Sequence, residues 1–237
     1  MTRRRWIADE VVGDRAALTG AHAAHLSRVL RVQVGQEFDV ACGERVRRGT
    51  VASVADERVE FVLGQEVAAR VPVPITLLLA VFKFDRMEWA IEKCTELNVT
   101  SIMPVIARRS EKHLAAAAEK RVERWRRIAR EASQQSRRVT TPVIADPVKL
   151  AEAINVQAEL RIVLAETEKE ARLSDVVGGR EAATSVALAI GPEGGWTEEE
   201  LQLFEKAGWV SASLGATILR AETAAIAALA ITRAEMR

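Results

Sequence analysis

The sequence predicts an α/β protein in which a small β-barrel precedes a domain built around a mostly parallel sheet. Two observations predict this fold class. Short runs rich in β-branched residues fill residues 1–70, whereas short apolar runs alternate with helical patterns from Ile75 onward. Between them lies Val71-Pro72-Val73-Pro74, whose two prolines resist both a helix and a central strand. We therefore expect domains over residues 1–72 and 73–237.

In the first domain, β-branched runs at 37–42, 45–54 and 58–63 predict strands separated by turn signals. One helical segment at 20–32 interrupts them. Its expected apolar side consists of Ala24, Leu26, Val29 and Leu30. This pattern is typical of a small barrel.

In the second domain, apolar runs without alternation predict strands that are covered on both faces. They occupy residues 75–82, 101–106, 161–166, 185–190 and 210–215. Helical patterns lie between most of them, at 86–97, 115–136, 197–207 and 221–236. Ligands of such sheets bind at the carboxyl ends of the strands, so the loops that follow the strands are the candidate sites.

Composition excludes several classes of protein. Cys42 and Cys94 are the two cysteines, and they lie too far apart in sequence for a metal motif or a disulfide framework. No apolar run approaches the length of a membrane span, and no apolar segment follows the charged start at Met1. We expect a cytoplasmic protein without a metal and without a membrane.

The formal net charge is only +1, but residues 105–140 hold eleven Lys or Arg against four Asp or Glu, a local excess of seven. A basic patch in a near-neutral chain favours binding of nucleic acid or phosphate. A helix with one solvated face would carry the same charge, and this alternative stays open.

The loop from Gly191 to Gly195 contains four helix- and strand-breaking residues among five. It lacks the glycine spacing of dinucleotide or phosphate loops. Thr197 and Glu200 predict a capping box, and an acidic first helical turn disfavours a phosphate. We expect close backbone approach to a ligand with polar edges beside the Glu193 carboxylate. A rigid turn with an exposed glutamate is the alternative.

Two other loops have unusual compositions. In the stretch 214–225, Ile218 and Leu219 precede Arg220, which suits a cover over a flat apolar ligand such as a nucleobase. In the stretches 107–113 and 131–138, arginines, glutamines and serines gather, as they do in RNA contacts. Ordinary loop packing and a solvated helix face explain them equally well.

Taken together, five segments resemble the signature segments of the RsmE-type 16S rRNA (uracil-N3)-methyltransferases, which belong to the SPOUT (α/β-knot) superfamily. These segments are KFDRMEWAIEKCTELNV (83–99), RRSEKH (108–113), EASQQSRR (131–138), IGPEGGWTEEE (190–200) and SLGATILRAETAAIAAL (213–229). HLSRVLRVQVGQEFDV (25–40) is similar more weakly. The resemblance implies a trefoil knot near the C-terminus, a PUA-like RNA-binding barrel at the start, S-adenosylmethionine as cofactor, and a homodimer acting on 16S rRNA of the small ribosomal subunit.

The resemblance also implies the site residues. The expected cofactor contacts are Leu164, Glu166, Gly191, Pro192, Glu193, Gly194, Gly195, Leu214, Gly215, Ile218, Leu219, Thr223 and Ala224. The expected RNA contacts are Arg4, Arg28, Arg31, Arg108, Arg109, Ser110, Lys112, Arg124, Arg127, Gln135, Ser136, Arg137 and Arg138.

Attack by N3 of uridine needs removal of its proton or stabilisation of the developing anion. Arg220 and Glu222 are the expected catalytic residues, for anion stabilisation and for the role of base or orienting group. Two other functions remain open: a methyltransferase of this fold that acts on another RNA, such as a tRNA ribose or base, and an RNA-binding module without catalysis.

Overall fold

The computed structural model describes residues 5–43, 45–67, 72–136, 138, 140–178 and 183–236. The chain divides into two compact units. The first unit comprises Met1–Val71 with Ser133–Thr141, and the second comprises Pro72–Ala132 with Pro142–Arg237. Each unit has its own sheet and core.

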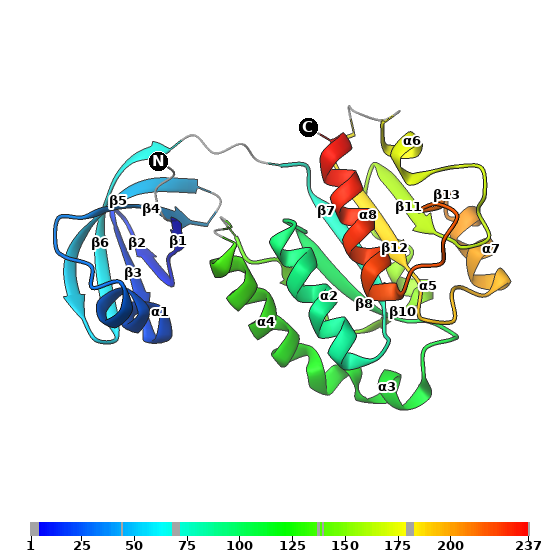
Figure 1. Cartoon of the computed structure of the whole chain (residues 1–237), viewed down its shortest axis with the longest axis horizontal. Coiled ribbons are helices and arrows are strands. Elements are labelled where there is room, and N and C mark those ends of the chain that lie inside the picture. Colours follow the sequence, from blue (N-terminus) through cyan, green and yellow to red (C-terminus); the bar gives the residue numbers. More distant parts are fainter. Residues whose placement is uncertain are drawn as a thin grey trace. The chain divides into compact units, whose positions relative to one another are not determined.

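The sheet of the first unit is strongly curled (Figure 1). In spatial order, the strands are β1 (Arg5–Ile7), β4 (Glu37–Cys42), β5 (Arg45–Ala55), β6 (Arg58–Val67), β3 (Arg15–Thr19) and β2 (Glu10–Val12). The two edge strands, β1 and β2, follow each other directly along the chain. Only the β1–β4 pair of this path is parallel. Between β1 and β2, the Ala8 amide donates to the Ala41 carbonyl and the Asp9 amide to the Ala17 carbonyl, both at 2.9 Å. The sheet is therefore barrel-like, as predicted.

The helix predicted at 20–32 is shorter than expected and changes type. Helix α1 (Gly20–Ala24) continues into a π-helical turn (His25–Val29), and Arg31 follows with a φ of 50°. The wider π turn shifts the helical phase. Leu26 is buried, as expected, but Val29 is 66% exposed, so its placement on the apolar side was wrong.

The second unit is built on a parallel sheet, as the apolar runs predicted. Its strand order is β10 (Val148–Lys149), β8 (Ser101–Ile106), β7 (Ile75–Ala80), β12 (Val186–Ile190), β11 (Leu160–Leu164) and β13 (Val210–Ala212). Strand β9 (Val143–Ile144) also pairs with β8. On its outer edge, β8 pairs with β9 before Pro104 and with β10 after it. Pro104 itself has no amide hydrogen to donate.

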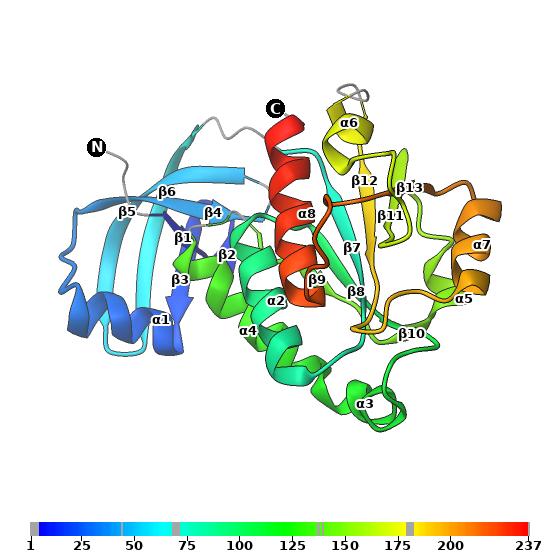
Figure 2. The same cartoon turned by 45° about the vertical axis from the view of Figure 1, so that its right-hand side comes forward.

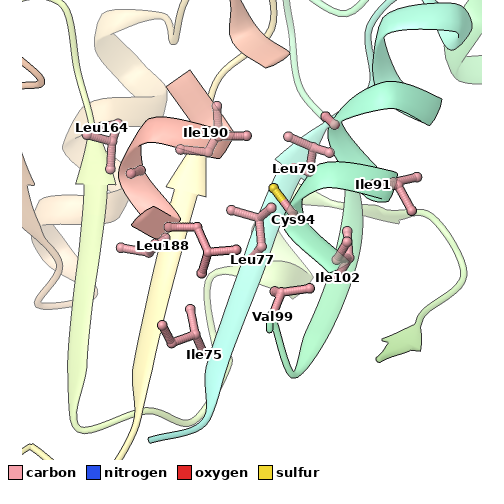
Figure 3. Packing of buried hydrophobic residues seen from close by; sticks show 14 of the residues in the cluster. Ile75, Leu77, Leu79, Ile91, Cys94, Val99, Ile102, Leu164, Leu188 and Ile190 are labelled. Carbon is pink, nitrogen blue, oxygen red and sulfur yellow. The ribbon is translucent and has the colours of Figure 1, made fainter. Parts of the chain in front are cut away.

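Helices cover both faces of this sheet (Figure 2). Alternate residues of a strand point to opposite faces. Leu77 and Leu79 lie in one apolar cluster, with Ile91 of α2 (Phe84–Glu96), whereas Leu78 lies in the other. Figure 3 shows the first cluster, where Leu77 and Leu79 lie beside the α2 residues Ile91 and Cys94. Burial on both sides explains why the strands lack polar alternation.

The remaining helices divide between these two clusters. Helices α4 (Val122–Gln135), α6 (Leu173–Gly178) and α8 (Ala221–Glu235) contribute to the first, and α5 (Leu150–Ala153) and α7 (Glu198–Lys206) to the second. The helix predicted at 115–136 is interrupted: α3 (Lys112–Ala117) passes through a 3₁₀ turn (Ala118–Arg121) into α4. The tighter turn accompanies complete burial of Ala118.

Two further observations concern membranes and metals. Within the described ranges, no helix is long and apolar enough to cross a membrane. The same residues contain no cluster of histidine, cysteine and carboxylate side chains that would bind a metal ion. Cys42 and Cys94 are both free thiols.

Candidate functional site

A cavity of about 410 Å³ lies where β11, β12 and β13 end. Its wall consists of the loops that follow these three strands, together with side chains from other elements. All the residues predicted to contact a cofactor line it except Thr223, and Arg220 lines it as well. Ala165, Ala216 and Thr217 also line it and lie within the loops predicted to complete the pocket, at 164–166 and 214–219. Sequence reasoning assigned Arg109 to RNA alone, and it missed the lining residues Arg86, Thr167, Ile190, Trp196, Leu201, Ala212, Ser213 and Ala221.

Bare backbone forms part of the cavity wall at two glycines. Gly195 has a φ of +69° and Gly215 a φ of +119°, conformations that residues with a Cβ rarely adopt. Apart from the two adjacent residues, no atom of the described chain lies within 4 Å of the place where either Cβ would stand. Peptide groups at these positions therefore face open space that a ligand can enter.

The loop after β12 is anchored at its far end by aromatic packing. Trp196 is 7% exposed, and its ring lies 5.0 Å from that of Phe204 in α7. Phe204 in turn lies 5.1 Å from Trp209. These edge-on contacts bury large apolar surfaces and fix the direction in which the chain leaves the cavity.

The predicted capping box is confirmed, and its glutamate has a second role. The Glu200 amide donates to Thr197 Oγ1 at 3.3 Å, and the Thr197 amide donates to Glu200 Oε2 at 2.9 Å. The other carboxylate oxygen, Oε1, accepts the Arg108 amide at 2.8 Å. One buried carboxylate thus joins the loop after β8 to the start of α7.

Arg109 belongs to the cavity wall. Its Nη1 donates to the Gly194 carbonyl at 2.6 Å and to the Trp196 carbonyl at 3.3 Å. A Cβ on Gly194 would stand 3.3 Å from Arg109 Cδ. The side chain therefore holds the glycine loop in place, while its exposed remainder keeps contact with solvent.

The residues next to Arg109 in sequence differ in burial: Arg108 and Lys112 are exposed, whereas Ser110 is buried. Arg108 Nη1 lies 3.4 Å from Glu199 Oε2 in an exposed ion pair. The Ser110 hydroxyl is buried and donates to the Val81 carbonyl at 2.8 Å, so this residue shapes the loop and does not face RNA. Lys112 is exposed.

At the start of α8, some of the predicted site residues line the cavity and others do not. Ala221 and Ala224, three residues apart on one helix face, line the cavity, and Arg220 stands exposed at the N-cap. Glu222 is 3% exposed and Thr223 is exposed, and neither lines the cavity. The contact of Thr223 with a cofactor stays a prediction, and its side chain is exposed outside the cavity wall.

Arg86 is a cavity residue that sequence reasoning did not select. It lies in the first turn of α2, just after β7. Its Nη1 is 3.6 Å from Glu193 Oε1, and its Nε is 3.8 Å from Glu222 Oε1. The available signal was an arginine soon after the end of an apolar strand, within a segment already quoted for its resemblance.

Much of the local positive charge is balanced inside the second unit. Arg124 forms a two-pronged pair with Glu88, at 2.6 and 2.7 Å, which raises the pKa of the guanidinium. Arg126 pairs with carboxylates at 2.6 and 3.0 Å, and Arg127 pairs with Glu131 at 3.9 Å. The exposed α4 face is therefore less positive than the sequence suggests.

The other predicted RNA contacts lie in the first unit. Arg28 is paired with Asp56 at 3.1 Å, and Arg31 and Gln135 are exposed. The Ser136 hydroxyl donates to the Ser133 carbonyl at 3.4 Å. Arg138 is only 7% exposed, and its Nε donates to the Thr140 carbonyl at 3.0 Å, so it supports the fold while its contact with phosphate stays a prediction. The predictions for Arg4 and Arg137 lie outside the described residues.

Comparison with known proteins decides the family. A model of the RNA methyltransferase domain matches residues 69–233. Ribosomal RNA small subunit methyltransferase E of Synechocystis sp. is 32% identical over 229 residues, which cover 94% of this chain and 74% of that protein. The Bacillus subtilis protein of the same name is 30% identical, covering 90% and 87%. The chain belongs to this family.

Solved structures agree with this assignment and with the predicted fold class. Ribosomal RNA small subunit methyltransferase E of Neisseria gonorrhoeae, solved with S-adenosylmethionine bound, aligns with a TM-score of 0.81 at 30% identity, covering 96% of this chain and 95% of that one. A Legionella pneumophila protein described as a methyltransferase, also with the bound cofactor, aligns at 0.78 and 28% identity, covering 98% and 97%. The predicted resemblance is therefore confirmed.

Proposed function

We propose that this protein uses S-adenosylmethionine to methylate N3 of a specific uridine in 16S rRNA of the small ribosomal subunit. The observation that carries the proposal is the cavity wall. Three loops at the ends of adjacent parallel strands supply bare backbone, carboxylates and cations to one space, in a chain that belongs to the methyltransferase E family.

The residues of the cavity suit this cofactor. Open backbone at Gly195 and Gly215 allows close hydrogen bonding to polar edges, and Ile218 and Leu219 supply apolar surface for a flat adenine. Ile218 is 79% exposed, which otherwise leaves a large apolar side chain in water. The Glu193 carboxylate has the sign that complements a sulfonium or ammonium group.

When bound, the cofactor supplies a methyl group on a positively charged sulfur. The N3 proton of the uracil passes to solvent, and the N3 electron pair forms the bond to the methyl carbon. The carbon–sulfur bond breaks at the same time, and its bonding pair stays on sulfur. This protein's part is to hold the base in line and to stabilise negative charge on the uracil. Arg220 is exposed and lines the cavity, which supports assigning it a contact with the incoming nucleotide.

Binding of RNA is assigned to exposed basic and polar residues of both units. In the second unit these include Lys112 and Arg127, and in the first unit Arg28, Arg31 and Gln135. A base must leave its stack to be methylated at N3, so contacts to the surrounding backbone are needed. We also propose that residues 1–72 form a PUA-like RNA-binding domain.

A homodimer and a trefoil knot are part of the same proposal. Ala225 and Ala228 of α8 are fully buried against the chain's own core, whereas Trp89 of the adjacent α2 is 50% exposed. An exposed tryptophan beside an alanine-rich helix offers apolar surface to a second copy. Sedimentation of the wild-type protein and of a Trp89→Glu variant tests this assembly, which we expect to weaken in the variant.

The experiment that tests the function uses small ribosomal subunits and free 16S rRNA from a strain that lacks this methylation. After incubation with protein and S-adenosylmethionine, nucleosides are analysed by mass spectrometry. We expect 3-methyluridine with the wild-type protein, much less with Arg220→Ala, and an unchanged yield with Lys206→Ala, an exposed substitution in the last turn of α7. A methyl group on a ribose, on another base or only on tRNA would contradict the substrate. Binding without any transfer would indicate an RNA-binding module.

A further inference from the structure

Arg86 has an unusual combination of position and partners. It lines the cavity, and its side chain is 29% exposed. Glu193 and Glu222 approach it at 3.6 and 3.8 Å, which are ion-pair distances longer than hydrogen bonds. Within the described part of the chain, its guanidinium makes no hydrogen bond. Its N–H donors are therefore available to an acceptor in the cavity.

Glu222 explains why the guanidinium stays there. The Glu222 side chain is 4% exposed, and its Oε2 is covered and has no hydrogen-bond partner among the described residues. A buried carboxylate is costly unless a cation balances it, and Arg86 is the cation that the described residues bring within ion-pair range. Because Glu222 does not line the cavity, it does not touch a ligand there but acts through Arg86.

Three strand ends converge on this cation. Arg86 follows β7, Glu193 follows β12, and Glu222 follows β13. Two carboxylates on different elements lie within ion-pair distance of the guanidinium, and Arg86 itself lines the cavity. The arrangement therefore presents a positive charge whose orientation is set before any ligand binds.

We propose that Arg86 is a catalytic residue that stabilises the uracil anion during methyl transfer, and that Glu222 is its positioning residue and not the general base. This inference rests on the proposed function. Once the N3 proton has passed to solvent, the negative charge spreads over N3 and the two flanking carbonyl oxygens. A guanidinium N–H that donates to one of these oxygens lowers the energy of the anion and leaves N3 free to form its bond to carbon.

The proposal predicts a particular dependence on pH. The charged groups that face Arg86 or share its cavity are Glu193, Glu222, Glu166, Arg109 and Arg220. None of them is a histidine or cysteine, the side chains that ordinarily titrate near neutral pH. Where ionisation of the bound uracil limits the rate, the rising limb of kcat against pH should move when the charge of Arg86 is removed.

The test compares Arg86→Gln, Arg86→Lys and Glu222→Gln with the wild type at saturating cofactor and RNA. Arg86→Gln keeps hydrogen-bond donors but removes the charge, so the rising limb of kcat should move to higher pH. Each pH unit of movement corresponds to about a tenfold loss at low pH, and the loss should shrink as the pH rises. Arg86→Lys should restore part of the rate. Glu222→Gln should shift the limb in the same direction but less, and should add little to Arg86→Gln in a double variant.

Several outcomes would overturn the inference. A loss of rate that is equal at every pH would mean a structural role, and a weaker calorimetric affinity for S-adenosylmethionine with unchanged kcat would place Arg86 on the cofactor. If Arg86→Gln does not fold, judged by circular dichroism, the profiles of Arg86→Lys and Glu222→Gln decide the matter. Lys206→Gln, an exposed substitution in the last turn of α7 outside the cavity wall, is the control and should leave the profile unchanged. Absence of 3-methyluridine with the wild type would instead refute the proposed function.

Discussion

Replacing Glu200 with glutamine should destabilise the second unit, because one side chain currently satisfies two backbone amides. The residue is 2% exposed, and its two oxygens accept the amides of Arg108 and Thr197 at 2.8 and 2.9 Å. A glutamine offers one oxygen and one NH₂ group, so one of the two amides must face another donor.

The expected cost follows from this geometry. Losing one hydrogen bond to a charged group costs about 1.5–3 kcal/mol, and leaving a part-buried donor unpaired adds to this, so we expect a loss of about 2–4 kcal/mol in the free energy of unfolding. The matched control is Glu198→Gln, an exposed glutamate in the same first turn of α7, which should change stability little.

Guanidinium chloride unfolding followed by tryptophan fluorescence measures the effect, because four of the five tryptophans lie in the second unit: Trp89, Trp125, Trp196 and Trp209. The denaturation midpoint should fall while the m-value stays constant. A decrease of less than about 1 kcal/mol in the free energy of unfolding, at constant m, would refute the reasoning, because a part-buried amide that faces a donor should destabilise the fold by more than this.

The other predictions concern cofactor and RNA. Gly195→Val should abolish S-adenosylmethionine binding measured by calorimetry while the circular dichroism spectrum is retained, whereas Gly13→Val, with a similar positive φ of 57° in the first unit, should strain the backbone but leave binding intact. Equal affinities for both variants would contradict the assignment of the cavity. Arg127→Glu should reduce the slope of log K against log salt by roughly 0.7–0.9 per lost phosphate contact. An unchanged slope would show that this face of α4 is only solvated.

Much of the fold was predictable because local pattern and tertiary structure agree. The runs at 37–42 and 101–106 correspond to β4 and β8 at both ends. The short strands β1, β2, β9 and β10 were missed, because two or three residues are too few to show a period. Likewise, periodicity cannot reveal a knotted path, since the pattern of each element is the same whether or not the chain threads.

For the site, the sequence predicted which loops form the cavity better than it predicted the roles of individual charged side chains. Glycine and proline mark a loop wherever it lies, so the cavity wall around Gly195 and Gly215 was found. The direction of a charged side chain depends on rotation within its element and on partners distant in sequence. For this reason Glu222 was assigned to chemistry although it is buried, Arg138 was assigned to phosphate although it is enclosed, and Arg86 was not selected.

The arginines of residues 105–140 show how the same residue type serves two needs in this protein. Arg109 holds the glycine loop through backbone carbonyls, and Arg124 is held by Glu88, so neither offers a free charge to RNA without giving up a contact. Under the proposed function, we expect RNA affinity to come mainly from cations with long or exposed pairs, such as Arg127 and Arg28. Exposed pairs are worth little, so RNA phosphates can displace their carboxylates at low cost. The cavity can therefore stay rigid around the cofactor while the RNA-binding surface adapts to its substrate.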